Sequence, residues 1–157
     1  MKRFLIIAAI SVFLIACVNR KNEKRYLPNQ VDKAIYFEMP LADFKTLKGS
    51  KIESYDDGMS FRKVFFEAVN GTLIKYFGYY FDAEDDMPLY EVIIGYNDDA
   101  TANTEAVKLL GDPNYKETEW KFELKNEHNI LAWIFEKKLI ITALIPKTEW
   151  YEDTNKE

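Results

Sequence analysis

Hydrophobic residues after position 60 follow the two-residue period of β-strands, with short polar turns between the apolar runs. Three strands are predicted over residues 61–69, 73–82 and 89–96. Asn70 and Gly71 lie between the first two strands. Both residue types tolerate positive φ, so a tight type I′ hairpin turn is predicted there. The first part of the folded region should therefore contain an antiparallel sheet.

The spacing changes to that of a helix over residues 97–111. The apolar positions recur at helical intervals: Ala102, Ala106, Leu109 and Leu110. Asp98, Asp99 and Thr101 offer amino-terminal caps, and Gly111 with Pro113 offers a stop. One helix of about ten residues is therefore predicted.

The end of the chain returns to strand patterns. Apolar and polar residues alternate from Glu119 to Lys125, and a final hairpin is predicted over residues 130–135 and 139–145. The last two strands are almost continuously apolar, which is typical of strands in the centre of a sheet.

Before residue 61 the pattern is weaker. It favours a strand over residues 33–38, a short helix over 40–48 that ends at Gly49, and a loop over 50–60. Both halves of the chain contain a helix, a glycine (Gly49 or Gly111) and then strands. An internal duplication is therefore one interpretation.

Together these elements predict the fold class α+β, with a mostly antiparallel sheet of about five to seven strands and one or two short helices packed on it. Residues 31–157 suffice for one domain with its own core. Cys17 is the only cysteine. The chain therefore forms no internal disulfide, and its stability must come from that core.

The first sixteen residues have the pattern of a secretory signal. Lys2 and Arg3 form a short positive segment, and residues 4–16 are apolar apart from Ser11. As a helix, the apolar run to Val18 reaches roughly 22 Å, which is short of the roughly 30 Å hydrocarbon core. A removable signal is therefore favoured over a permanent membrane span.

The end of this run, Leu14-Ile15-Ala16-Cys17, resembles the lipobox of bacterial lipoproteins. The resemblance implies cleavage between Ala16 and Cys17, diacylglycerol on the Cys17 sulfur and often a third acyl chain on the new amino group. Two or three chains anchor a protein firmly. An ordinary signal peptide and an uncleaved anchor are the alternatives. Val18 stands where an aspartate would resemble an inner-membrane retention signal, which favours the outer membrane in a Gram-negative host.

Charge is distributed unevenly along the chain, which holds 21 basic and 26 acidic residues. Residues 17–30 are predicted to be a flexible basic tether, whereas residues 31–157 are strongly acidic. The tether is either a solvated spacer or a contact for anionic head groups, where each nearby cation contributes on the order of 1 kcal/mol. The acidic folded part argues against nucleic-acid binding.

No residue pattern predicts a catalytic, metal or cofactor site. His128 is the only histidine, so neither a Ser-His-Asp triad nor a zinc site is favoured. The acidic turn over residues 82–86 offers oxygen ligands for calcium, but Met87 stands where an EF-hand needs glycine, and a solvated turn is the alternative. A pair of carboxylates acting as in glycosidases is defined only by its separation in space, so the sequence leaves it open.

The segment Leu110-Gly111-Asp112-Pro113 follows the predicted helix and precedes antiparallel strands. Over about residues 101–145 the chain resembles a class of small envelope proteins. This class includes the small lipoprotein subunit of the outer-membrane β-barrel assembly machinery and the β-lactamase inhibitor protein. The resemblance implies helices packed on an antiparallel sheet, and it implies no particular function.

Aromatic residues are concentrated in the first three predicted strands. Over residues 73–82 both alternating sets of side chains are largely apolar. Either each face of the sheet is covered, or one aromatic surface is exposed. Tyr76, Tyr79 and Tyr80 are the candidates for an exposed interaction face. Burial beneath the amino-terminal segment and the helix is the alternative.

These observations favour a non-enzymatic, membrane-anchored envelope lipoprotein that binds another protein or supports an assembly through its sheet. One alternative is an inhibitor or immunity-type lipoprotein that neutralises a toxin or hydrolase with its acidic residues. Another is a binder of a small ligand or glycan, or an enzyme that works through carboxylates. The predicted partners are the membrane, through the lipid on Cys17, and a protein of unknown identity.

Overall fold

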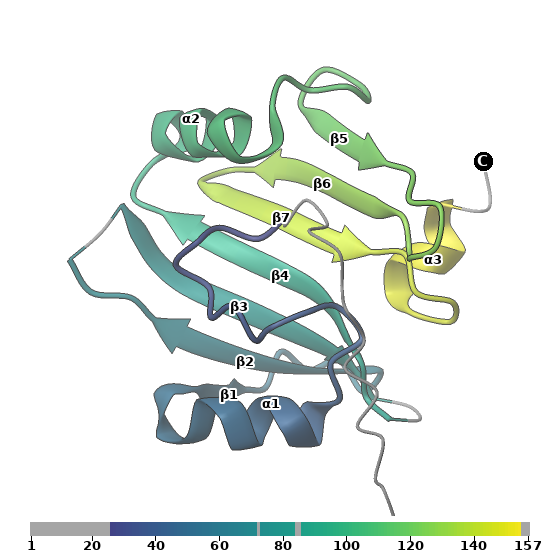
Figure 1. Cartoon of the computed structure of the whole chain (residues 1–157). Coiled ribbons are helices and arrows are strands. Elements are labelled where there is room, and N and C mark those ends of the chain that lie inside the picture. Colours follow the sequence, from purple (N-terminus) through teal and green to yellow (C-terminus); the bar gives the residue numbers. More distant parts are fainter. Residues whose placement is uncertain (1–25, 72, 84–85, 155–157) are drawn as a thin grey trace, which may run out of the picture.

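The computed structural model describes residues 26–71, 73–83 and 86–154 (Figure 1). Within them the chain forms a seven-stranded antiparallel sheet in the order β1-β2-β3-β4-β7-β6-β5. The strands are β1 (Glu53–Tyr55), β2 (Arg62–Ala68), β3 (Ile74–Asp82), β4 (Leu89–Tyr96), β5 (Glu119–Phe122), β6 (Ile130–Phe135) and β7 (Lys138–Ala143). The helices are α1 (Leu41–Lys48), α2 (Asp99–Leu110) and α3 (Glu149–Thr154), with a 3-10 turn, η1 (Gly49–Lys51), after α1. The predicted α+β fold class is confirmed, and α3 is a helix beyond the one or two predicted.

Two antiparallel meanders build the sheet. Strands β1 to β4 form the first and β5 to β7 the second, and the two meet where β4 pairs with β7. Each meander is preceded by a helix that ends at a glycine in the left-handed region, Gly49 with φ 54° and Gly111 with φ 88°. The two halves therefore repeat one order of elements, helix, glycine and meander, and the first half has one strand more.

Helix α2 forms where the sequence predicts it. The Asp98 side chain accepts a hydrogen bond from the backbone N–H of Thr101 at 2.8 Å and so caps the first turn. The buried residues of the helix are Ala102, Ala106 and Leu110. Two of these are alanines, so the helix axis can lie close to the strands beneath it.

The first predicted hairpin also forms, but its turn differs from the prediction. The backbone N–H of Val69 donates to the carbonyl of Lys75 at 2.9 Å, which places the middle of the connection beyond Gly71. Gly71 has a φ of 75°, whereas Asn70 does not have a positive φ. The predicted type I′ turn is therefore wrong, because that turn needs positive φ at both positions.

Residues 33–38 do not form the predicted strand. They belong to a series of turns, one of which is closed by a bond of 3.0 Å from the Ile35 N–H to the Asp32 carbonyl. Val31, Ile35 and Met39 are buried. Since these residues are four positions apart, they suit consecutive turns that cross the sheet, and they lack the two-residue period of a strand.

Two elements escape prediction from the sequence. Strand β1 lies within residues 50–60, which are predicted as a loop. Its three residues are exposed, and it forms an edge of the sheet, so no apolar pattern marks it. Helix α3 has only six residues, and so short a segment shows no recognisable helical period.

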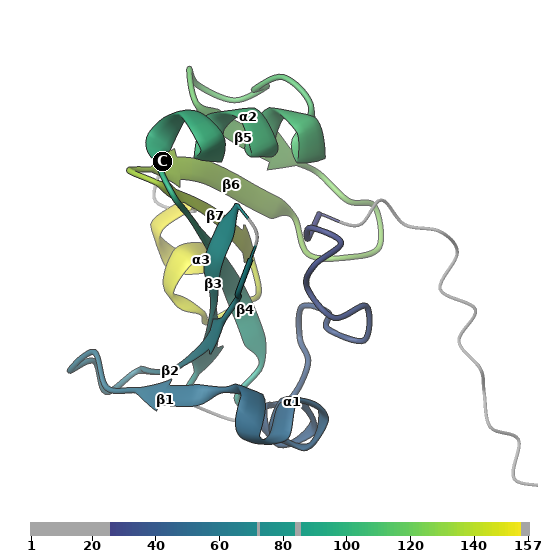
Figure 2. The ribbon, with the colours of Figure 1, turned by 90° about the vertical axis from the view of Figure 1, so that its left-hand side faces the viewer.

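One face of the sheet, which we call the packed face, carries the core. Its buried side chains include Phe65, Phe77, Tyr79, Phe81, Val92, Ile94, Ala132, Leu139 and Ile141. The segment 26–40, α1 and α2 cover this face, whereas α3 lies on the other side of the sheet (Figure 2). Phe44 of α1 is fully buried, and its ring centroid lies 4.8 Å from that of Tyr79 and 4.9 Å from that of Phe81.

A buried ion pair fixes the end of α1 to the packed face. The Lys48 Nζ donates to Oε2 of Glu67 on β2 at 2.7 Å, and the Lys48 side chain is only 5% exposed. The hydroxyl of Tyr79 on β3 donates to the same oxygen at 2.7 Å. One cation meets one carboxylate here, so this network is balanced in charge.

Candidate functional site

The opposite face of the sheet, which we call the open face, is covered only in part. In the described part of the chain α3 packs on one end of this face, and no helix or strand covers the rest (Figure 2). The strand register places these side chains on the open face: Tyr55, Val64, Phe66, Tyr76, Tyr80, Glu91, Ile93, Leu131, Trp133, Phe135 and Ile140. An apolar surface of this kind is the strongest candidate site in the molecule.

Three rings form an aromatic stripe across the uncovered part of the open face. Tyr55 on β1 meets Phe66 on β2 edge to face with a centroid distance of 5.2 Å. Phe66 meets Tyr76 on β3 in the same manner at 5.4 Å. Tyr55 is 54% exposed, and the other two rings are half-buried. Towards the other edge of the face, Phe135 on β6 is 56% exposed.

Two glycines give the rings of the aromatic stripe room to lie against the sheet. A Cβ added to Gly95 on β4 would lie 2.3 Å from Cε1 of Tyr76, and one added to Gly78 on β3 would lie 3.0 Å from Cε1 of Phe66. Neither glycine has positive φ. These positions are therefore occupied by glycine because of the close approach of aromatic rings, and not because of backbone conformation.

The structure separates the three tyrosines predicted as an interaction face. Tyr76 and Tyr80 lie on the open face, where both are half-buried. Tyr79 lies on the packed face, is fully buried and donates its hydroxyl hydrogen to Glu67. Neighbouring residues of a strand point to opposite faces, so Tyr79 cannot share a surface with Tyr80. Tyr79 is therefore not part of the site, and Tyr55 takes its place.

A group of polar side chains, which we call the α3 cluster, holds α3 on its end of the open face. It consists of Arg62, Tyr90, Glu91, Glu149 and Trp150. Glu149 accepts hydrogen bonds from Nη1 of Arg62 at 2.8 Å and from the hydroxyl of Tyr90 at 2.9 Å. The indole N–H of Trp150 donates to Glu91. Tyr90 reaches this face through a bulge, because the pairing of β3 with β4 skips it.

Burial changes the proton affinities in the α3 cluster. Glu91 is only 3% exposed. This burial, together with the nearby charge of Glu149, raises the pKa of Glu91 to about 8, against the opposing effects of Trp150 and Arg62. Burial likewise raises the pKa of Tyr80 to about 12, and the charge of Glu91 adds to that effect. Glu91 therefore holds its proton more tightly than an ordinary glutamate.

Arg62 connects the α3 cluster to the loop between β1 and β2. Its Nε donates to Oδ2 of Asp57 at 2.6 Å. Burial disfavours the charged form of Arg62, but Asp57 and Glu149 outweigh that effect and raise its pKa above the ordinary value. For Asp57 burial acts in the upward direction. The backbone N–H of Met59 and the Arg62 side chain nevertheless lower its pKa overall.

Sequence reasoning missed Glu91, although the sequence contains a signal for it. Glu91 is the only charged residue in β4, where its neighbours are apolar or glycine. A lone carboxylate inside an apolar strand indicates either a paired buried charge or a neutral acid. The contact with α3 could not be inferred, since α3 itself has no clear pattern.

The remaining predicted positions lie elsewhere. Cys17 and Ala16 lie outside the described residues, as do Glu84 and Asp85 of the acidic turn. His128 contacts Glu38 through Nε2 at 2.8 Å and so links a loop to the amino-terminal segment. In residues 26–71, 73–83 and 86–154, no three His, Cys, Asp or Glu side chains are placed to hold a metal ion.

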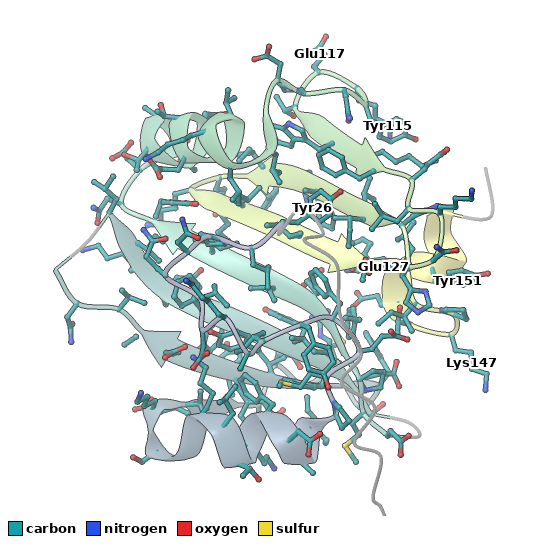
Figure 3. All side chains as sticks on the ribbon, viewed as in Figure 1. Tyr26, Tyr115, Glu117, Glu127, Lys147 and Tyr151 are labelled. Atoms are coloured by element: carbon teal, nitrogen blue, oxygen red, sulfur yellow. The ribbon has the colours of Figure 1, made fainter. Side chains whose placement is uncertain are left out.

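The described part of the chain begins on the packed side of the domain. Figure 3 shows Tyr26 on the amino-terminal segment in front of the sheet, whereas Glu117, Glu127 and Lys147 project outwards at the periphery. The ring of Tyr26 packs on that of Phe122 at a centroid distance of 4.6 Å. The described chain therefore begins on the face opposite to the aromatic stripe.

None of the helices that the structure describes is long and apolar enough to cross a membrane. The fold and the site together define an α+β protein with one packed face and one partly open aromatic face. No family model, no curated protein and no solved structure matches the chain.

Proposed function

We propose that this chain is a membrane-anchored envelope lipoprotein that binds another protein through the uncovered part of its open face. The proposed activity is to bind a protein or to support an assembly, without catalysis. The observation that carries the proposal is the aromatic stripe of Tyr55, Phe66 and Tyr76, which lies on a sheet face without cover from a described helix or strand.

The energetics of the stripe favour a protein partner. Complete burial of a large apolar side chain contributes roughly 1.5–3 kcal/mol. Tyr55 of the stripe and Phe135 towards the other edge are each more than half exposed, so a partner that covered both would recover roughly half of this free energy at each ring. Tyrosine and phenylalanine are enriched in the centres of protein interfaces, and their rings have few rotatable bonds to restrain on binding.

The polar groups beside the stripe support a binding role over catalysis. Arg62, Glu149 and Trp150 make hydrogen bonds within the α3 cluster. These groups fix a helix to the sheet, and their hydrogen bonds are directed at one another and not at a vacant space. The proposal therefore assigns no catalytic residue.

The lipid anchor would be joined to the domain on the side away from the proposed binding face. Cys17 precedes Tyr26 by nine residues, a span of at most roughly 32 Å. Tyr26 lies on the packed side of the sheet. A lipid on Cys17 would therefore be connected to the domain from that side, and the aromatic stripe lies on the opposite side of the sheet.

Site-specific photo-crosslinking in intact cells tests the proposal. A photoreactive phenylalanine analogue is placed at Tyr55 and, separately, at Phe135. The matched controls are Leu47 on α1 and Val107 on α2, which are also exposed apolar residues, at 38% and 40%. We expect the same partner to be captured from positions 55 and 135 and not from 47 or 107. Equal capture at all four positions, or none at 55 and 135, would contradict binding through this face.

The anchor is tested separately with Cys17→Ala. We expect this variant to leave the membrane fraction or to remain unprocessed, because two or three acyl chains are what would hold the protein there. Unchanged membrane association and unchanged electrophoretic mobility would count against lipidation without affecting the binding face.

A further inference from the structure

Helix α3 is attached to the sheet through contacts of its side chains. A six-residue helix is not stable by itself in water, so contacts with the rest of the molecule must hold it. The Trp150 ring meets Trp133 of β6 edge to face at a centroid distance of 4.9 Å, and its N–H donates to Glu91. Glu149 accepts from Arg62. Docking of α3 thus includes an aromatic contact between Trp150 and Trp133 and hydrogen bonds at two carboxylates, Glu91 and Glu149.

The charges around Glu91 are not balanced. Arg62 is the cation of the cluster, and it already binds Asp57 at 2.6 Å and Glu149 at 2.8 Å. Glu91 is a third carboxylate beside this one guanidinium. If all three were ionised, the site would hold an excess of negative charge around a group that is 3% exposed, which is strongly unfavourable.

Among the side chains that the structure describes, the other neighbours of Glu91 offer no compensating cation. From β3 and β4 the neighbouring titratable groups are the phenols of Tyr80 and Tyr90. On β7 the register partner of Glu91 is the uncharged Thr142. In the same row Lys121 of β5 lies three strands away, about 14 Å, and its ammonium group is 3.9 Å from Glu123.

We propose that α3 is a pH-dependent cover for one end of the open face, docked most firmly when Glu91 is protonated and weakened when Glu91 is ionised. When Glu91 loses its proton, its carboxylate becomes charged and is more stable in water than in its buried position. Hydration requires that Trp150 leave its contact. Release of α3 would uncover Trp133, Tyr90 and Glu91 and so extend the open face. The proposal concerns contacts within this chain and stands whether or not the aromatic stripe binds a protein.

The direction of the pH effect follows from the burial of Glu91. Burial raises the pKa of Glu91 in the docked state to about 8, whereas a hydrated glutamate has a pKa of about 4.3. The docked state therefore holds the proton more tightly than the released state. Docking is strongest below about pH 4.3, weakens by up to about tenfold per pH unit as the pH rises towards 8, and changes little above that.

Fluorine NMR of the full chain in detergent micelles, with 5-fluorotryptophan in place of tryptophan, measures this directly. The chain contains three tryptophans, and Trp150→Phe identifies the resonance of Trp150. We expect that resonance to move towards its position in urea-unfolded protein between pH 5 and 8 and to level off above pH 8. The Trp120 resonance should remain fixed, because that ring is buried on the packed face.

Three variants assign the effect to Glu91. Glu91→Gln keeps an acceptor for Trp150 without titrating, and we expect its Trp150 resonance to be independent of pH between 5 and 9. Glu53→Gln is the matched control, since Glu53 is an exposed glutamate of the same face in β1, and it should retain the full pH response. Glu149→Gln removes one of the competing carboxylates, so its pH response should be smaller than that of the wild type.

The wild type and Glu149→Gln test the proposal even if the Glu91→Gln variant does not fold. If the Trp150 resonance of the wild type does not move between pH 5 and 9, the cover is not pH-dependent and the proposal fails. It also fails if Glu149→Gln responds as strongly as the wild type, or if Glu91→Gln folds and still shows the transition.

Discussion

The two faces of the sheet differ in how their buried charges are matched. On the packed face one lysine, Lys48, meets one carboxylate, Glu67, and the pair fixes the end of α1. On the open face one arginine, Arg62, binds two carboxylates, and a third, Glu91, lies beside them. Removal of one partner from a buried balanced pair is destabilising, because it leaves an uncompensated charge. A buried carboxylate without its own cation contributes to stability to an extent that depends on pH. The contact that depends on pH in this molecule is therefore on the open face.

The faces also differ in how they hold their aromatic rings. Phe44 enters the packed face from α1 and is enclosed by rings from β2 and β3. On the open face the rings lie against glycines of the strands themselves. Rings of the first kind are held by a covering helix, whereas rings of the second kind need none and can remain available at the surface.

Substitution of the central ring of the packed face should have the largest effect. We expect Phe44→Ala to lower the free energy of unfolding by about 3–5 kcal/mol, because it leaves a cavity among aromatic side chains. Urea denaturation measures this loss. Leu47→Ala on the exposed side of α1 is the control and should change stability by less than about 0.5 kcal/mol. Similar losses for both variants would show that α1 does not anchor the core.

The free energy of unfolding, measured over a range of pH, should reveal the effect of Glu91, the unbalanced carboxylate of the open face. The pKa of Glu91 in the folded protein is about 8, above its value in the unfolded chain of about 4.3. Its contribution to stability is therefore fully present below about pH 4.3 and is lost as the pH rises to 8. Relative to Glu91→Gln, we expect the wild type to lose on the order of 1 kcal/mol per pH unit between pH 5 and 8. Parallel stability curves for the two proteins would contradict this sign.

An added methyl group at Gly95 should have a smaller effect. In Gly95→Ala the new Cβ would lie 2.3 Å from a ring carbon of Tyr76, so the ring must leave the sheet. We expect a loss of about 1–3 kcal/mol, measured by thermal unfolding. In a background that carries Tyr76→Ser the same change should cost much less, since the clash is absent. Additive losses in the double variant would show that the contact is unimportant.

Removal of the exposed ring of the stripe should have the smallest effect on stability. Tyr55→Ser changes a residue that is 54% exposed at the edge of the sheet, and we expect a change of less than about 0.5 kcal/mol. Capture of the partner by co-purification from detergent-solubilised envelopes should nevertheless fall strongly. A large loss of stability with unchanged capture would assign Tyr55 to the fold and not to binding.

The elements predicted correctly are those in which local pattern and tertiary packing agree. Helix α2 has a cap, a period and a stop within its own sequence, and β4 has the predicted bounds. The sequence favours a strand over residues 33–38, but the buried residues Val31, Ile35 and Met39 are four positions apart, which suits turns. Strand β1 has no local signal at all, since it exists through its pairing with β2.

For the candidate site, the sequence predicted only that aromatic residues are involved. An excess of aromatic residues in 73–82 indicated that one face could be exposed. The register was needed to remove Tyr79 from that face and to add Tyr55 and Phe66 from other strands. The approach of Tyr76 to Gly95 crosses from β3 to β4, and the bond from Trp150 to Glu91 joins residues 59 positions apart. Contacts between residues so far apart in the sequence leave no local sequence pattern.

The length of β1 has a consequence for solubility. A long, flat strand at the edge of a sheet offers unpaired N–H and C=O groups to other chains and promotes aggregation. Strand β1 has three residues, and the acidic Asp56 and Asp57 follow it directly. The edge beside the exposed ring of Tyr55 is therefore too short to recruit another strand, and the protein can present that ring to solvent while remaining dispersed.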